Sequence, residues 1–204
     1  MTLGETACEV RRRDRGVCRQ AGFSLLEIIV LLAIVGLLAS LAVVNFNSMM
    51  PGMRANRAAT QVAAILRDGR TAAMAGRHNI HVVFNADGMQ LNRQNADGTI
   101  TILHDKTQTF SPDVKFEILA PVDTPDGFGR AQACTFGGGG AAETTFSGEG
   151  MLVNFPDPAT PVNGSIFLGV PGNIRTARAV TVLGAIGAVH IWRWDTGTNT
   201  WQRQ

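Results

Sequence analysis

One carboxylate, Glu27, lies in a run of 22 residues that carries no other charge, residues 23–44. An ionised carboxylate costs about 2.5–3.5 kcal/mol at the centre of a bilayer and less near its surface, so Glu27 needs a donor or a cation. Ser24 and Glu27 fit the capping-box spacing S-x-x-E, in which Glu27 bonds a free backbone N–H of its own helix. The alternative is a positive group supplied by a neighbouring copy of the chain.

The length of this run predicts a membrane-spanning helix. Twenty-two helical residues rise about 33 Å, against a bilayer core of about 30 Å. A secretory signal would have a shorter apolar run followed by a small-residue cleavage site, and a plain signal anchor would not explain Glu27. Basic residues precede the run, which predicts that the N-terminus stays cytoplasmic and that the rest is exported. The basic residues are Arg11, Arg12, Arg13, Arg15 and Arg19.

Residues 19–27 read RQAGFSLLE and resemble the class III signal of type IV prepilins and type II secretion pseudopilins. In that family the leader ends in glycine, phenylalanine usually follows, and a glutamate comes four positions later. Gly22, Phe23 and Glu27 match this pattern. The resemblance implies cleavage between Gly22 and Phe23 by prepilin peptidase, an aspartic protease of the inner membrane, and N-methylation of Phe23. The new amine of Phe23 would then pair with Glu27 of an adjacent subunit in a helical filament.

Residues 51–77 are predicted to continue the helix as an amphipathic, periplasmic part. The proline that the family often has near the end of the apolar stretch is replaced by Val44, so Pro51-Gly52 is the expected break. Gly69 is expected to weaken the helix. One face is predicted to be apolar and the other solvated. The apolar face comprises Val62, Ile65, Leu66, Ala73 and Met74, and the solvated one Arg57, Arg67, Asp68 and Arg77.

Residues 78–204 are predicted to form a β-rich head, because short apolar runs alternate with glycine-containing turns. Asp87-Gly88 and Asp97-Gly98 are hairpin signals. A long Pro/Gly-rich loop is predicted over 120–143. The predicted fold class is therefore α+β. The resemblance to prepilins implies a pilin-like arrangement, in which a long N-terminal helix, transmembrane in its first half, packs on a largely antiparallel β-sheet head. Strands are predicted at 78–85, 89–94, 99–103, 114–119, 144–146, 151–155, 165–170, 179–183 and 189–194.

The head is similar to the GspH/FimT-type pseudopilin domain. The matching features are residues 70–73 (RTAA), residues 146–150 (FSGEG) and a terminal strand pair. Some FimT-like members bind DNA through Gly-Arg-Val-Arg on the last strands, whereas residues 187–190 here read GAVH, with neither arginine. The remaining candidates for phosphate contacts are Arg175, Arg178 and Arg193, with solvated surface charge as the alternative interpretation.

Charge patterning also argues against nucleic acid. Residues 1–22 carry five basic and three acidic side chains, and the remaining residues carry 13 of each sign. Once the leader is removed, the chain is formally neutral, so net charge does not favour a general polyanion-binding surface. A local basic patch stays open as an alternative.

Other chemistry-bearing residues give weaker signals. His78 and His81 would face opposite sides of a strand, so they are poor joint metal ligands. Asp123 and Asp126 are a minor calcium alternative without EF-hand spacing. Cys134 is the one cysteine outside the leader and is interpreted as a small buried apolar residue or an idle thiol. The sequence contains no catalytic signature and no phosphate-loop signature, so neither an enzyme nor a cofactor nor a metal is expected.

The three tryptophans near the C-terminus, Trp192, Trp194 and Trp201, are interpreted as packing residues, with a subunit or ligand contact as the alternative.

The sequence therefore predicts a leader over 1–22, a transmembrane assembly helix over 23–50, a periplasmic helix over 51–77 and a head over 78–204. The predicted function is a structural subunit, a minor pilin or pseudopilin of a type IV pilus or type II secretion pseudopilus. Its expected partners are prepilin peptidase, other pilins or pseudopilins and inner-membrane lipid before assembly. The alternative is a DNA-binding or adhesive minor pilin acting in natural transformation.

Overall fold

The computed structural model describes residues 24–85, 88–136, 139–140, 143–154 and 160–204, and the side chains of 42–45, 104–106 and 139–140 are not described. Several predictions from the sequence fall outside these ranges: the leader with its Gly22–Phe23 cleavage site, Asp87 of the first hairpin signal, the start of the glycine run and the end of the strand predicted at 151–155. The chain divides into two units, residues 1–44 and 45–204.

The first element is a long helix, α1, that spans Leu25–Gly76. The carbonyl of Ser24 accepts the backbone N–H of Ile28 at 3.2 Å, so Ser24 occupies the N-cap position. Pro51 lies inside α1, and the predicted break at Pro51-Gly52 is therefore wrong. Proline removes one backbone donor, but the turns that follow bury a continuous face, and that tertiary packing keeps the backbone helical.

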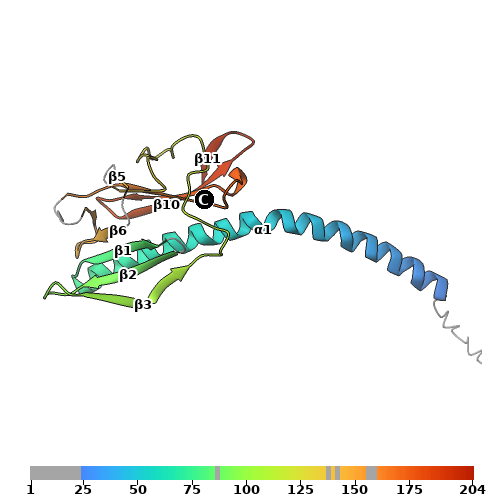
Figure 1. Cartoon of the computed structure of the whole chain (residues 1–204), viewed down its shortest axis with the longest axis horizontal. Helices are drawn as coiled ribbons and strands as arrows, with labels where there is room; N and C mark the ends of the chain where they lie inside the picture. The colour runs from blue at the N-terminus through green and yellow to red at the C-terminus, as the bar shows by residue number, and fades with distance from the viewer. Residues whose placement is uncertain (1–23, 86–87, 137–138, 141–142, 155–159) are drawn as a thin grey trace, which may run out of the picture. The chain divides into compact units, whose positions relative to one another are not determined.

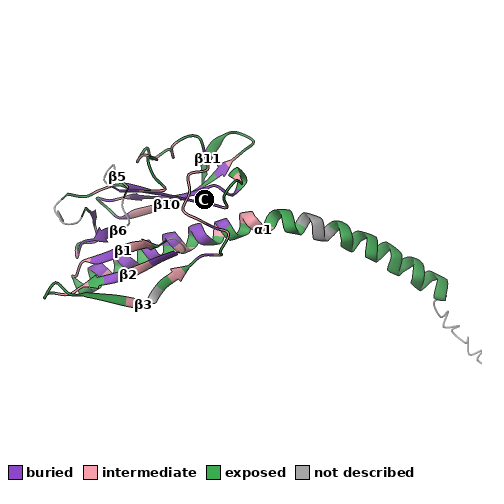
Figure 2. Ribbon diagram, in the orientation of Figure 1, coloured by how far each residue is buried: buried purple, intermediate pink, exposed green. Residues whose placement is uncertain are grey.

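The part of α1 that belongs to the second unit is amphipathic, and Figure 2 shows its buried face as a purple stripe. The apolar prediction is confirmed for four of its five residues, whereas Met74 is 41% exposed. Arg57, Arg67, Asp68 and Arg77 are exposed, as predicted. Alanines fill much of the stripe and allow the sheets to approach closely. The buried residues are Ala55, Ala58, Ala59, Val62, Ala63, Ile65, Leu66 and Ala73.

Gly69 serves this close approach. A Cβ on Gly69 would lie 3.2 Å from Cδ2 of Leu91 and 3.4 Å from Cδ2 of Phe146, so the missing side chain is what lets these residues pack on the helix. The glycine that was expected only to weaken the helix is thus buried at the contact between helix and sheet.

The first sheet is antiparallel and has the strand order β3-β2-β1-β6-β7 (Figure 1). Asn85 pairs with Gly88 at the first hairpin, and a Cβ on Gly88 would lie 2.0 Å from the carbonyl oxygen of Gln108, which only glycine avoids. Gly98 has φ +81° in the second turn. The strands are β1 (Ile80–Asn85), β2 (Gly88–Gln94), β3 (Ile100–Thr109), β6 (Glu143–Phe146) and β7 (Leu152–Val153).

The second sheet is also antiparallel, with the order β11-β10-β9-β8-β4-β5. Two predictions are wrong here. The predicted loop over 120–143 contains two strands, and the strand predicted at 114–119 is irregular apart from one bridge, Lys115 with Gly169. The strands are β4 (Cys134–Phe136), β5 (Gly139–Gly140), β8 (Gly164–Leu168), β9 (Arg178–Leu183), β10 (Ala188–Asp195) and β11 (Thr200–Arg203), and a 3-10 helix, η1, spans Ile174–Thr176.

Both faces of the second sheet are buried. On one face, Ile166 and Val180 join the core that α1 forms with both sheets. On the other face, Phe167 and the three tryptophans form a second apolar cluster, packed against Ile118, Leu119 and Ala120. The packing interpretation of the tryptophans is thus confirmed. The irregular segment of residues 111–133 serves as the cover of this second cluster.

Candidate functional site

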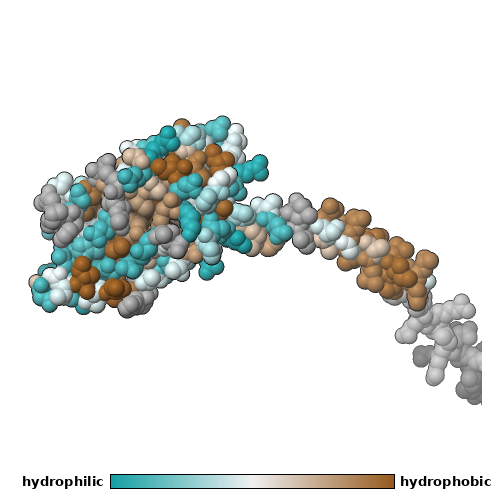
Figure 3. Space-filling view, in the orientation of Figure 1, coloured by the Kyte–Doolittle hydropathy of each residue, from teal (hydrophilic) through white to brown (hydrophobic). Residues whose placement is uncertain are grey.

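The residues of α1 that belong to the first unit expose apolar side chains on all sides, and Figure 3 shows this stretch in brown. The exposed fractions run from 43% at Ile28 to 77% at Leu25. A helix that is apolar all round is stable in water only when another apolar surface covers it. The exposed residues are Leu25, Leu26, Ile28, Ile29, Val30, Leu31, Leu32, Ile34, Val35, Leu37, Leu38 and Leu41.

Glu27 lies in the first turn of α1 and is the one acidic residue there. The positive end of the helix dipole favours a carboxylate at this place. A shallow, almost wholly apolar groove runs from Glu27 along one side of the helix and is lined by Leu26, Glu27, Val30, Leu31, Ile34 and Val35. The structure therefore presents the carboxylate at the end of an apolar surface, as the sequence predicts, while its partner stays a prediction because Phe23 lies outside the described residues.

Within the described residues, no single helix is long and apolar enough to span a membrane by itself. Leu25–Leu41 and Phe46–Gly76 satisfy the length and composition criteria only as a bent pair. The membrane span predicted from residues 23–44 therefore stays a prediction.

The three arginines proposed as phosphate contacts line one shallow cavity of about 350 Å³ in the second unit. Arg175 belongs to η1, Arg178 begins β9, and Arg193 lies in β10 directly opposite Arg178. Trp194, Asp195 and Thr196 complete the lining. We call this set of six residues the arginine pocket. Arg175 and Arg193 are exposed, as the surface interpretation expects, but Arg178 is only 4% exposed, so that interpretation is wrong for Arg178.

Arg178 is held by neutral acceptors. Its Nε donates to Oδ1 of Asn56 in α1 at 2.6 Å, and its Nη1 donates to the carbonyls of Ala177 at 2.8 Å and Arg175 at 3.2 Å. Burial, and then the charge of Arg193, lowers the pKa of Arg178 to about 10. Arg178 remains a cation near neutral pH, and within the described residues no carboxylate lies within ion-pair distance of it.

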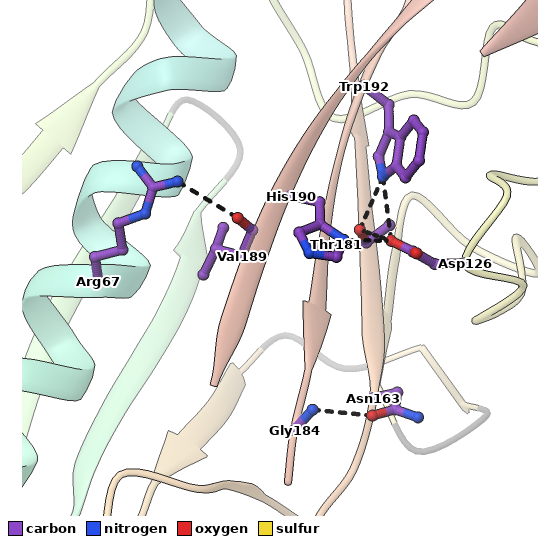
Figure 4. A network of polar contacts seen from close by, with 8 residues as sticks. All are labelled: Arg67, Asp126, Asn163, Thr181, Gly184, Val189, His190 and Trp192. Carbon is purple, nitrogen blue, oxygen red and sulfur yellow. Dashed lines mark hydrogen bonds and ion pairs between the residues drawn. The ribbon is translucent and has the colours of Figure 1, made fainter. Parts of the chain in front are cut away.

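A second polar cluster fixes the loop that covers the tryptophans (Figure 4). The Oδ2 atom of Asp126 accepts from Thr181, from Nε1 of Trp192 at 3.2 Å, and lies 3.1 Å from Nδ1 of His190. Burial opposes ionisation of Asp126, but the hydrogen bonds from Thr181, His190 and Trp192 outweigh it and lower its pKa below 3.8. His190 stands in GAVH where the DNA-binding pattern has its last arginine, so this position binds a loop carboxylate instead.

The calcium alternative gains no support from this geometry. Asp123 accepts the backbone N–H groups of Thr124 and Gly129, whereas Asp126 is bound to the second sheet. Among the residues that the structure describes, no group of three or more His, Cys, Asp or Glu side chains could hold a metal ion.

Replacing Asp126 with asparagine is expected to lower the free energy of unfolding by about 1–2 kcal/mol near neutral pH, because bonds to a charged acceptor are lost. The folded-state pKa of Asp126 lies below its ordinary value of 3.8, so its stabilisation is complete above that value and disappears as the pH falls below it. Urea unfolding of wild type and Asp126→Asn across this range checks the effect. The exposed Glu143→Gln is the control, and a difference that persists at acid pH would contradict the account.

Comparisons with known proteins give one solved structure. The crystal structure of the type IV minor pilin FimU from Pseudomonas aeruginosa (strain PAO1) matches 66% of this chain and 84% of that chain, with 17% sequence identity and a TM-score of 0.44. No protein-family model matches the sequence. No curated protein matches it either.

The two sequence motifs at residues 70–73 and 146–150 lie in contact in the structure. A hydrogen bond joins Arg70 of the first to Gly150 of the second, 80 residues later in the chain. Nε of Arg70 in α1 donates to the carbonyl of Gly150 at 3.1 Å. Gly187, with φ +60°, packs against the same pair, and a Cβ there would lie 2.5 Å from Nε of Arg70. Arg70, Gly150 and Gly187 therefore hold α1 against both sheets, which is a structural role.

The cysteine and histidine interpretations are tested in part. Cys134 is half-buried and free, and burial raises the pKa of its thiol to about 12, which agrees with a passive apolar role. The placement of His78 on a strand is wrong, because β1 begins at Ile80. His81 is buried, and its Nδ1 lies 3.0 Å from Oγ1 of Thr145.

Proposed function

We propose that this chain is a structural subunit of a pilin-like filament, a minor pilin or a pseudopilin, that assembles through the N-terminal half of α1. The observation that carries the proposal is the run of exposed apolar side chains over Leu25–Leu41, in which Glu27, near its start, is the one charged residue. Such a surface suits lipid before assembly and the helices of neighbouring subunits afterwards. The head of an α+β fold would then face the periplasm.

Three further features support the proposal. The bond between Gly22 and Phe23 lies at the start of the apolar run, where cleavage would keep the helix on the mature protein. Glu27 lies four residues beyond Phe23 in the sequence, so it has the spacing of the prepilin signal. The C-terminal half of α1 shares one core with both sheets, which fixes this half of the helix to the head. In this role the chain needs no catalytic group and no cofactor.

Processing provides the first test. Gly22→Leu is expected to abolish the mature form, because a bulky side chain next to the scissile bond obstructs the peptidase, and the chain should accumulate at its full length. The matched control is Gln20→Leu, which adds similar apolar bulk two residues upstream. Immunoblotting of membrane fractions and N-terminal sequencing check both variants. A mature band from Gly22→Leu, or equal loss in both variants, would refute the assigned site.

DNA binding is a second candidate, and the gathering of Arg175, Arg178 and Arg193 in one pocket favours it. Against it, Arg178 is committed to Asn56 and two carbonyls, which leaves Arg175 and Arg193 as exposed donors. Gel-shift titration of the full chain with duplex DNA separates the two candidates. Retention that weakens steeply with salt supports DNA binding. Absent or salt-independent retention removes it and leaves the structural role.

A further inference from the structure

The arginine pocket places two like charges opposite one another. Arg178 and Arg193 are directly paired residues on the antiparallel strands β9 and β10. Like charges at such positions destabilise a sheet, and here one of them is buried. Where a sequence breaks a local rule of stability in this way, a functional requirement is a common cause.

The pocket carries an excess of positive charge. It contains three guanidinium groups and one carboxylate, Asp195. Both carboxylate oxygens are engaged elsewhere: Oδ1 accepts the backbone N–H of Gly197 at 2.9 Å and Oδ2 accepts Nε2 of Gln202 at 2.7 Å. Hydrogen bonds from the Gly197 backbone, with a smaller contribution from Arg193, lower the pKa of Asp195, so it is ionised. Two positive charges therefore remain without a counter-charge among the described residues.

We propose that the arginine pocket binds one terminal phosphate group, either free phosphate or a phosphate monoester. A phosphate dianion matches the two uncompensated charges, and its several oxygens accept from guanidinium groups that approach from different elements. A single carboxylate or phosphodiester carries one charge and leaves one guanidinium unneutralised. Arg175 and Arg193 are the exposed donors of the pocket, while Arg178 is buried, donates to Asn56 and contributes its positive charge to the lining.

The pocket is independent of the assembly role of α1. All six lining residues belong to the second unit, and none lies in the apolar stretch. Phosphate binding would therefore survive a Glu27 substitution, and a chain that fails to assemble would still bind the anion. The two proposals thus fail separately.

Calorimetric titration of the full chain in detergent with inorganic phosphate, at constant ionic strength, tests the proposal. Wild type is expected to bind at one saturable site. Arg193→Ala should weaken binding by roughly tenfold or more, because charge-assisted hydrogen bonds are lost. The matched control, Arg203→Ala, removes an exposed arginine of β11 outside the pocket and should leave the affinity unchanged. Tryptophan fluorescence verifies that both variants remain folded.

Competition identifies the chemistry. A short oligonucleotide with a 5′-phosphate is expected to displace inorganic phosphate, whereas the same oligonucleotide without it should not. No saturable binding by folded wild type would overturn the proposal, as would equal losses in Arg193→Ala and Arg203→Ala. Equal competition by the two oligonucleotides would show that the pocket recognises phosphodiesters, which overturns the preference for a terminal phosphate.

Discussion

Phe146→Ala is expected to lower the free energy of unfolding of the head by about 3–5 kcal/mol, the usual cost of truncating a fully buried phenylalanine. Phe146 has no exposed surface and lies on β6, opposite both Ile80 and Leu152. Its ring also contacts the position of Gly69 in α1. The substitution would therefore leave a cavity at the junction of helix and sheet. Chemical denaturation followed by circular dichroism measures the loss.

The control for Phe146 is Ile100→Ala, because Ile100 lies in the same sheet and is 58% exposed. Its removal should change stability by no more than about 0.5 kcal/mol. Similar losses for the two variants would mean that the core does not lie where β6 meets α1.

Glu27→Gln is expected to leave processing intact and to reduce incorporation into filaments at least tenfold. In an assembled bundle, Glu27 would lie among apolar side chains, and breaking a buried ion pair by neutralising one partner costs about 3–5 kcal/mol. Every 1.4 kcal/mol is about tenfold in an equilibrium constant, so the expected defect is large. Shearing filaments from cells and immunoblotting the sheared and cell-bound fractions measures it.

Two controls separate the interpretations of Glu27. Ser24→Ala removes the N-cap side chain, which costs about 1 kcal/mol of helix stability, and should reduce assembly far less than Glu27→Gln. Glu27→Asp retains the charge and should rescue part of the assembly. If Ser24→Ala and Glu27→Gln had equal effects, Glu27 would act as a helix cap and not as an intersubunit partner.

The sequence predicted those features of the fold that local periodicity specifies. The buried positions Val62 and Leu66 follow from the 3.6-residue repeat. Gly98 occupies its expected turn with φ +81°, and Gly88 begins β2, paired with Asn85 where the first hairpin was expected. Local rules failed where distant contacts compete with them. Pro51 does not break α1, because the helix beyond it is stabilised by burial against the sheets. Strand β11 was missed because its four residues, Thr200–Arg203, form no apolar run and depend on pairing with β10.

The candidate sites differ in how far sequence predicts them. The apolar stretch with Glu27 can be predicted from the sequence, because residue composition and spacing within one helix define it. The arginine pocket depends on the register between β9 and β10, which places Arg178 opposite Arg193, and on Asn56 in α1, which is 122 residues from Arg178 in the chain. The burial of Arg178 follows from that long-range contact, and nothing in its local sequence signals it.

Mass spectrometry of the chain recovered from sheared filaments tests the central claim most directly. The account predicts one assembled form that lacks residues 1–22, begins at N-methylated Phe23 and retains the whole apolar stretch of α1. Recovery of assembled chains that still carry the leader, or that have lost residues 23–44, would contradict assembly through this helix.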